Sequence, residues 1–137
     1  MQNEILIFTL TAITWILAEI LKVFTYYLKS KKFDLKIALK YGGMPSSHTA
    51  FVTGLATTIF IIEGFTTAFL LSLAIWILVL RDLVVIRGHI DTNSKNIKKI
   101  TKNKMNNSFL SHTNKEIAIG FLIGIITPFI LIFLLTM

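Results

Sequence analysis

The segment Ile117–Met137 reads IAIGFLIGIITPFILIFLLTM and contains no charged residue. A helix needs roughly 20 apolar residues to cross about 30 Å of hydrocarbon, so this segment predicts a transmembrane helix. Two further apolar segments, Ile5–Leu28 and Phe65–Ile86, reach the same length. The segment Ser46–Ile62 is shorter, and we expect a tilted helix or one partly buried by the rest of the protein.

The composition agrees with a small membrane domain. The chain has 137 residues, of which 54% are hydrophobic and 15% are charged, and its mean hydropathy is +0.72. Soluble domains average about 25% charged residues. The absence of cysteine excludes disulfides, thiol nucleophiles and iron–sulfur clusters. The sequence therefore predicts an all-α, polytopic membrane bundle of about four transmembrane helices, formed by a single domain over residues 1–137.

The net charge of +7 is concentrated between the spans. All lysines except Lys22 lie in residues 29–40 or 95–115. Basic connections beside apolar spans are typical of the cytoplasmic side, which argues against a nucleic-acid partner. We expect both connections in the cytoplasm, and both termini and the Glu63-Gly64 turn outside, in a bacterial cell membrane. A short amphipathic helix within residues 92–104 would lie at the membrane interface.

Charged residues within or beside the spans are candidates for function, because burying a charge in hydrocarbon is costly. They are Glu19, Lys22 and Lys29 in the first span, and Arg81, Asp82 and Arg87 near the end of the third. The first three share one helical face. Two interpretations stay open: ion pairs and lysines that reach the headgroups, or a set of cations that binds an anionic ligand.

A second candidate region precedes the short span and reads Tyr41-Gly42-Gly43-Met44-Pro45-Ser46-Ser47-His48. Ser46 or Ser47 can cap the following helix, and a helix N-terminus favours phosphate. His48 could donate a proton to a leaving oxygen. In the alternative interpretation, the serines only cap the helix and His48 lies at the level of the headgroups.

The third region, Ser111–Glu116, opens the last span. Thr113 and Glu116 have the spacing of a capping box, which serves a purely local purpose. His112 and Glu116 are four residues apart, so the carboxylate can also orient the imidazole, as a nucleophilic or basic histidine requires. All three regions lie near helix ends that we expect on the cytoplasmic face.

These residues resemble a known family. Pro45-Ser46-Ser47-His48 resembles the P-S-G-H motif of the type 2 phosphatidic acid phosphatases, whose superfamily includes the vanadium-dependent haloperoxidases. The longer string G-G-M-P-S-S-H looks like the small divergent branch of that superfamily. Lys22-x6-Lys29-Ser30 is similar to its K-x6-R-P motif, and His112-x3-Glu116 to its H-x3-D motif.

Two departures accompany the resemblance. Asp82 and Arg87 match a D-x-x-G-V-R pattern of the divergent branch, but the glycine is absent. The superfamily's third motif begins with Ser-Arg, and Met105 and Asn106 occupy those places here. We expect Arg87 to supply the missing cation, with Arg81 as the alternative.

The resemblance implies hydrolysis of a lipid phosphate at the cytoplasmic face, through a phosphohistidine and without a metal or other cofactor. It implies that His112 is the nucleophile, that Glu116 orients it and that His48 protonates the leaving oxygen. The phosphate oxygens would be bound by Lys22, Lys29, Ser46, Ser47 and either Arg87 or Arg81.

Other functions stay open beside the enzyme. The strongest is a catalytically silent membrane protein that binds phosphorylated lipid headgroups or serves as an assembly partner. A zinc site built from His48, His89 and His112 lacks any HExxH-type spacing, and a transporter would require repeats that the sequence does not show. Homo-oligomer formation also stays open.

The predicted orientation can be measured by cysteine labelling, since the chain has no cysteine of its own. Cysteines introduced at Lys36 or Lys99 should resist a membrane-impermeant thiol reagent in intact cells, whereas a cysteine at Gly64 should react. Reaction of the first two from outside would reverse the orientation.

Overall fold

The computed structural model describes residues 2–31, 33, 43–86, 92–93, 96 and 113–137. Over these residues the chain is helical, and no strand is found among them. The helices are α1 (Gln2–Ser30), α2 (Ser47–Glu63), α3 (Thr67–Arg81) and α5 (Asn114–Thr136), and a π-helical turn, η2 (Asp82–Ile86), continues α3. The all-α prediction is confirmed, and the helix bounds lie within a few residues of those expected.

Three of the described helical segments have the length and composition to cross a membrane: α1, residues Thr67–Val85 and α5. The fourth helix, α2, has 17 residues. It is also the most deeply packed helix: nine of its residues are buried, whereas Ser72 is the buried residue of α3. The expectation of a short helix partly covered by protein is therefore confirmed. The interfacial helix expected within residues 92–104 lies almost entirely outside the described residues.

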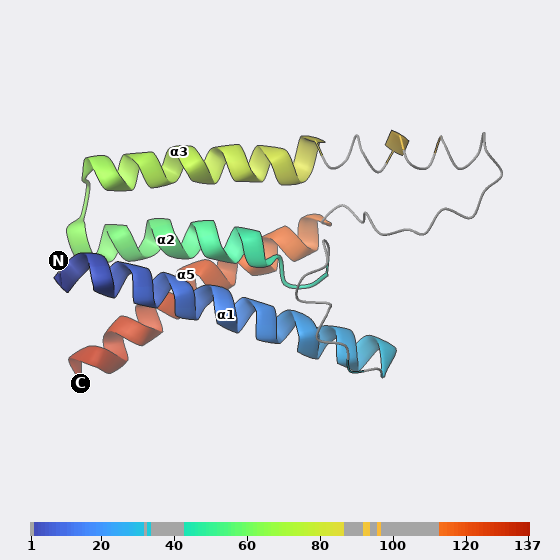
Figure 1. The fold of residues 1–137 in the computed structure, drawn as a ribbon, viewed down its shortest axis with the longest axis horizontal. Helices are drawn as coiled ribbons and strands as arrows, with labels where there is room; N and C mark the ends of the chain where they lie inside the picture. Colours follow the sequence, from blue (N-terminus) through green and yellow to red (C-terminus); the bar gives the residue numbers. More distant parts are fainter. Residues whose placement is uncertain (1, 32, 34–42, 87–91, 94–95, 97–112) are drawn as a thin grey trace.

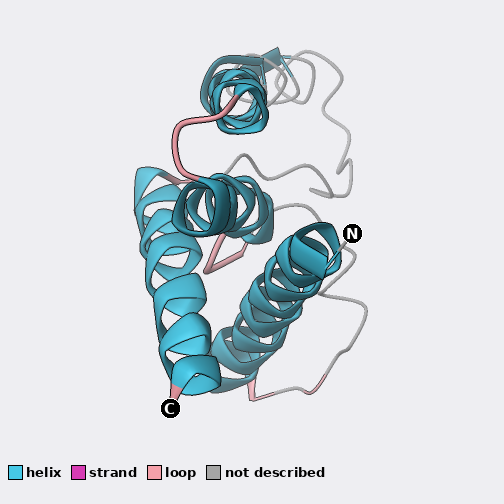
Figure 2. Ribbon diagram, turned by 90° about the vertical axis from the view of Figure 1, so that its left-hand side faces the viewer, coloured by secondary structure: helices cyan, strands magenta, loops and turns pink. Residues whose placement is uncertain are grey.

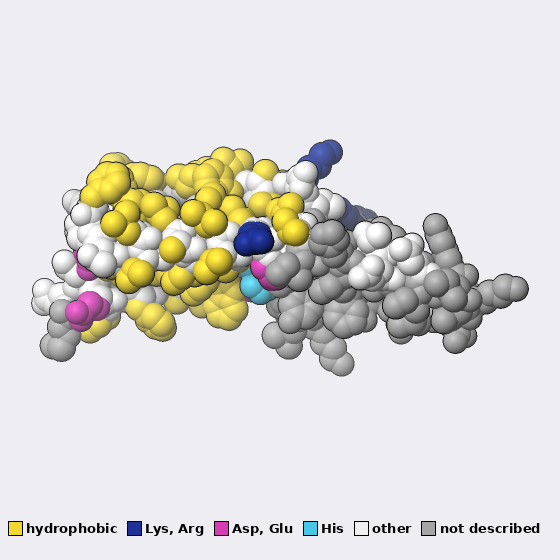
Figure 3. Space-filling view, turned by 90° about the horizontal axis from the view of Figure 1, so that it is seen from above, with side chains coloured by type: hydrophobic (Ala, Val, Ile, Leu, Met, Phe, Trp, Pro, Cys, Tyr) yellow, Lys and Arg dark blue, Asp and Glu magenta, His cyan; other side chains and the backbone are white. Residues whose placement is uncertain are grey.

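The four helices alternate in direction, and both termini lie at the same end of the bundle (Figure 1). Viewed along the bundle, α2 lies in the middle, with α3 on one side and α1 and α5 on the other (Figure 2). Helix α2 packs extensively on α1, α3 and α5, and α1 also contacts α5. Apolar side chains cover much of the outer face on the α3 side (Figure 3), as expected for a surface that faces lipid.

Local signals in the sequence set the helix ends. Ser46 caps α2 by accepting a hydrogen bond from the Thr49 N–H, and Thr66 caps α3 in the same way. Gly64 ends α2 with φ of 73°, a conformation that side chains with a Cβ rarely adopt. The capping box of Thr113 and Glu116 is present at the start of α5, as the spacing predicted.

Two glycines let α5 approach α2 at backbone distance. A Cβ at Gly124 would lie 2.5 Å from the Thr53 Cβ and 2.8 Å from the Ala50 carbonyl oxygen, and a Cβ at Gly120 would collide with the Ser46 carbonyl oxygen. This G-x-x-x-G spacing is typical of close helix pairs in membranes, where small residues permit van der Waals packing. A larger residue at Gly120 or Gly124 would therefore push α5 away from α2.

Replacing Gly124 with valine tests this contact. We expect Gly124→Val to lower the free energy of unfolding by about 1–3 kcal/mol, because overpacking forces the two backbones apart. Ala118→Val is the matched control, since Ala118 is exposed on the same helix. Thermal melting of both variants in detergent measures the difference. Equal melting temperatures would contradict the close approach.

Candidate functional site

The candidate residues gather at one end of the bundle. The end of α1, the start of α2, the end of α3 with η2 and the start of α5 all lie at the end opposite the two termini (Figure 1). The described candidates at this end are Lys22, Lys29, Ser46, Ser47, His48, Arg81 and Glu116. Arg87, His89 and His112 lie outside the described residues. The alternating topology therefore gives the described candidates the common end that the sequence predicted.

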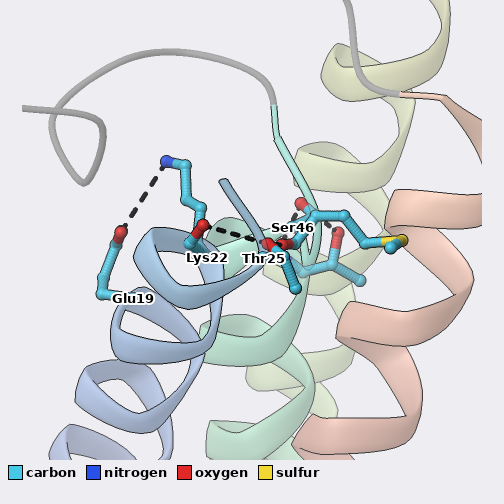
Figure 4. Close-up of polar contacts among 6 residues, drawn as sticks. Glu19, Lys22, Thr25 and Ser46 are labelled. Carbon is cyan, nitrogen blue, oxygen red and sulfur yellow. Dashed lines mark hydrogen bonds and ion pairs between the residues drawn. The ribbon is translucent and has the colours of Figure 1, made fainter. Parts of the chain in front are cut away.

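The segment Gly43–Ser46 rests on α1. Gly43 has φ of 102°, and a Cβ added there would lie 3.4 Å from the Cγ and Cε atoms of Lys22. The Thr25 hydroxyl donates a short hydrogen bond to the Met44 carbonyl oxygen and lies 3.0 Å from the Lys22 carbonyl oxygen (Figure 4). The motif before α2 is thereby held against the last third of α1.

Lys22 is buried beneath this segment, with 3% of its surface exposed. Its Nζ atom lies 3.7 Å from Oε2 of Glu19, one helical turn earlier (Figure 4). The ion pair that the spacing allowed is therefore present. Because the lysine stem packs against Gly43, the ammonium group is held where α1 meets the start of α2. Lys29, in the last turn of α1, is exposed.

The two serines are buried, at 0% and 1% exposure for Ser46 and Ser47. The Ser46 hydroxyl oxygen accepts hydrogen bonds from the Thr49 N–H at 3.4 Å and the Thr49 hydroxyl at 2.9 Å. Ser46 thus performs the capping role that the sequence allowed. His48, in the first turn of α2, is exposed. Of the three, His48 is the side chain that solvent or a headgroup reaches in this structure.

The start of α5 is tied directly to the start of α2. The backbone N–H of Ser46 donates a 3.0 Å hydrogen bond to the Glu116 carbonyl oxygen. The Glu116 carboxylate accepts a 3.0 Å hydrogen bond from the Thr113 N–H within the capping box. His112, which Glu116 was expected to orient, lies outside the described residues, so that role stays a prediction.

The end of α3 lies on the other side of α2. Helix α2 stands between α3 and α1 (Figure 2), and α3 packs along α2. Arg81 is exposed at the end of α3, and Leu83 in η2 is almost completely buried. Arg81 therefore lies at the same end of the bundle as the other described candidates, but on a helix that α2 separates from α1. The π-helical turn covers the Asp82–Ile86 part of the pattern singled out in the sequence, and such turns are frequent at functional sites.

These observations define the class of protein. It is a helical membrane bundle with basic residues and a histidine gathered at one end. The model of the Divergent PAP2 family matches residues 1–127, and the chain belongs to that family. It is also 28% identical over 152 residues to the "Uncharacterized membrane protein YuiD" of Bacillus subtilis strain 168, covering 96% of this chain and 95% of that protein. No solved structure matches the chain. The family resemblance is therefore confirmed, and the chain is a small PAP2-related membrane protein.

A double-mutant cycle measures the contribution of the Glu19–Lys22 ion pair to the stability of the fold, without any ligand. We expect Glu19→Leu to destabilise the fold by about 3 kcal/mol, because it leaves a buried charge without this partner. The double variant Glu19→Leu/Lys22→Met should regain most of that stability, since methionine keeps the apolar stem under Gly43. Unfolding in detergent measures these two variants and the single variant Lys22→Met. Additive losses in the double variant would show that the pair is not coupled.

Proposed function

We propose that this chain is an integral-membrane phosphatase that hydrolyses a lipid phosphate through a phosphohistidine on His112. The observation that carries the proposal is the hydrogen bond from the Ser46 N–H to the Glu116 carbonyl oxygen. Ser46 is two residues before His48, and Thr113, which begins the capping box with Glu116, directly follows His112 in the chain. The bond therefore ties together the two segments that carry the histidines of the family's motifs.

In the proposed reaction, an imidazole nitrogen of His112 attacks phosphorus and the bond from phosphorus to the lipid oxygen breaks. His48 gives its proton to that oxygen, so the lipid leaves as an alcohol. His48 then takes a proton from water, which attacks the phosphohistidine, breaks the P–N bond and releases inorganic phosphate. Membership of the family supports this sequence of steps.

Cationic groups would stabilise the charge on the equatorial phosphate oxygens, which is the main catalytic task in phosphoryl transfer. Lys22 is held beside the segment that precedes α2, and the first turn of α2 adds the positive end of a helix dipole. Lys29 and an arginine, Arg87 or Arg81, complete the proposed set. Arg87 is the choice that the family pattern favours, and it follows directly after η2.

A second function is favoured by a specific observation. Ser46 and Ser47 are buried and Ser46 is used as a cap, while Met105 and Asn106 replace the Ser-Arg pair of the third motif. A silent protein that binds phosphorylated headgroups needs the cations but not the nucleophile. The two functions make opposite predictions for turnover and the same prediction for binding.

The experiment is phosphate release from a panel of lipid phosphates by the purified protein in detergent, with and without EDTA. We expect turnover that EDTA leaves unchanged. His112→Ala should abolish both turnover and the phospho-enzyme, and His48→Ala should slow phospho-enzyme formation most with poor leaving groups. His89→Ala is the matched control and should remain active.

Three outcomes would contradict the enzyme. Normal turnover by His112→Ala would refute the phosphohistidine. Loss of activity in EDTA together with loss in His89→Ala would favour a metal site instead. Tight binding of the lipid phosphates without any phosphate release would favour the silent binder.

A further inference from the structure

An apolar cavity of about 440 Å³ lies between α2, α3 and α5. Six aromatic residues contribute to its lining: Phe60, Phe65, Phe69, Trp76, Phe121 and Phe129. Several of these rings are exposed, including Phe65 at 81% and Phe129 at 54%. Phe69, Trp76, Phe121 and Phe129 belong to membrane-spanning segments, so what reaches them in a bilayer is hydrocarbon and not water.

The cavity has an inner end near the middle of the bundle and an aromatic outer end beside the α2–α3 turn. At the inner end, the Trp76 Nε1–H donates a 2.9 Å hydrogen bond to the Thr53 hydroxyl, and the Trp76 ring lies 6.0 Å from that of Phe121. At the outer end, beside the α2–α3 turn, the rings of Phe60, Phe65 and Phe69 pack with centroids 5.2 Å apart. The cavity therefore runs along the bundle from this turn toward its middle.

The depth of the cavity matches one leaflet. With a rise of 1.5 Å per residue, Thr53 lies about 15 Å along α2 from its end at Glu63. Half of a 30 Å hydrocarbon core is also about 15 Å. The cavity thus begins at the membrane surface near the α2–α3 turn and ends near the bilayer midplane. It occupies the leaflet opposite the end of the bundle that carries Lys22 and His48 (Figure 1).

The position and the lining of the cavity select its occupant. The cavity has an almost entirely apolar surface and lies beside two membrane-spanning segments, within the depth of one leaflet. The acyl chain of a phospholipid in that leaflet therefore reaches it wherever the protein is inserted. Leaving the cavity empty would forfeit the contacts of its lining.

We propose that the α2/α3/α5 cavity binds one acyl chain of a phospholipid from the leaflet on the side of the α2–α3 turn. The headgroup stays at the turn, and the chain end reaches the Trp76–Thr53 hydrogen bond. The lipid fills the space between α3 and α5 and so supports α3, which packs chiefly on α2. This site is separate from the proposed phosphate chemistry and does not depend on it.

Native mass spectrometry in detergent with added dioleoyl phosphatidylglycerol tests the proposal. The wild type should retain one lipid per chain, and Thr57→Phe, which fills the cavity from α2, should weaken retention at least about tenfold. Leu70→Phe is the matched control, because Leu70 is 60% exposed on α3 and does not line the cavity. Glycerol 3-phosphate, which has no chain, should not compete. Equal retention by all three proteins would overturn the proposal, as would a lipid-free dimer that Thr57→Phe disrupts.

A second measurement leaves the lining of the cavity unchanged and needs no substitution that fills it. In a Trp15→Phe background, Trp76 is the remaining tryptophan. A phosphatidylcholine with bromines near the end of its chain should quench Trp76 fluorescence, saturating at one lipid per chain. Bromines close to the headgroup should quench less, because the chain end lies at Trp76. Quenching that only follows the bulk mole fraction of brominated lipid, or that is stronger for bromines near the headgroup, would overturn the proposal.

Discussion

The backbone contact between α5 and α2 is the constraint on which the rest of the structure depends. In a bilayer, apolar burial gives helices little reason to associate, so close packing and hydrogen bonds must hold them together. Gly120 and Gly124 remove the side chains that would separate the two backbones. That approach brings the Glu116 carbonyl oxygen to the Ser46 N–H. This one surface therefore holds together the start of α2, with Ser46 and His48, and the start of α5, with Glu116.

Helix α2 can occupy the centre because its buried side chains are small. Thr49, Ala50, Thr53 and Thr58 are all at most 4% exposed, and small side chains permit close helix approach on several sides at once. The hydroxyls of Thr49 and Thr53 take part in hydrogen bonds to Ser46 and Trp76. A short helix surrounded by α1, α3 and α5 need not meet lipid along its whole length, which explains how 17 residues suffice.

The sequence predicted the positions of the helices well and the packing between them poorly. Helix positions follow from the cost of charge in hydrocarbon, and the capping box of Thr113 and Glu116 follows from local spacing, so both could be predicted. The burial of Lys22 under Gly43 could not, because it depends on where a loop lies on another helix. The same limit applies to Arg81: the topology gives it the same end as Lys22, but only packing puts α2 between their helices. The aromatic cavity combines side chains from three helices and has no signature in any one of them.

Thr53 of α2 takes part in the contact with α5 and in the contact with α3. Its Cβ is the atom that a side chain at Gly124 would strike, and its hydroxyl accepts the hydrogen bond from Trp76. One residue therefore contributes both to the seat of α5 on α2 and to the attachment of α3. Because Gly124 lies one turn from Gly120 on the same face of α5, the contact at Thr53 continues directly into the contact that positions Ser46. The Trp76–Thr53 hydrogen bond and the backbone contacts at Gly124 and Gly120 thus connect α3 to the end of the bundle that carries the candidate site.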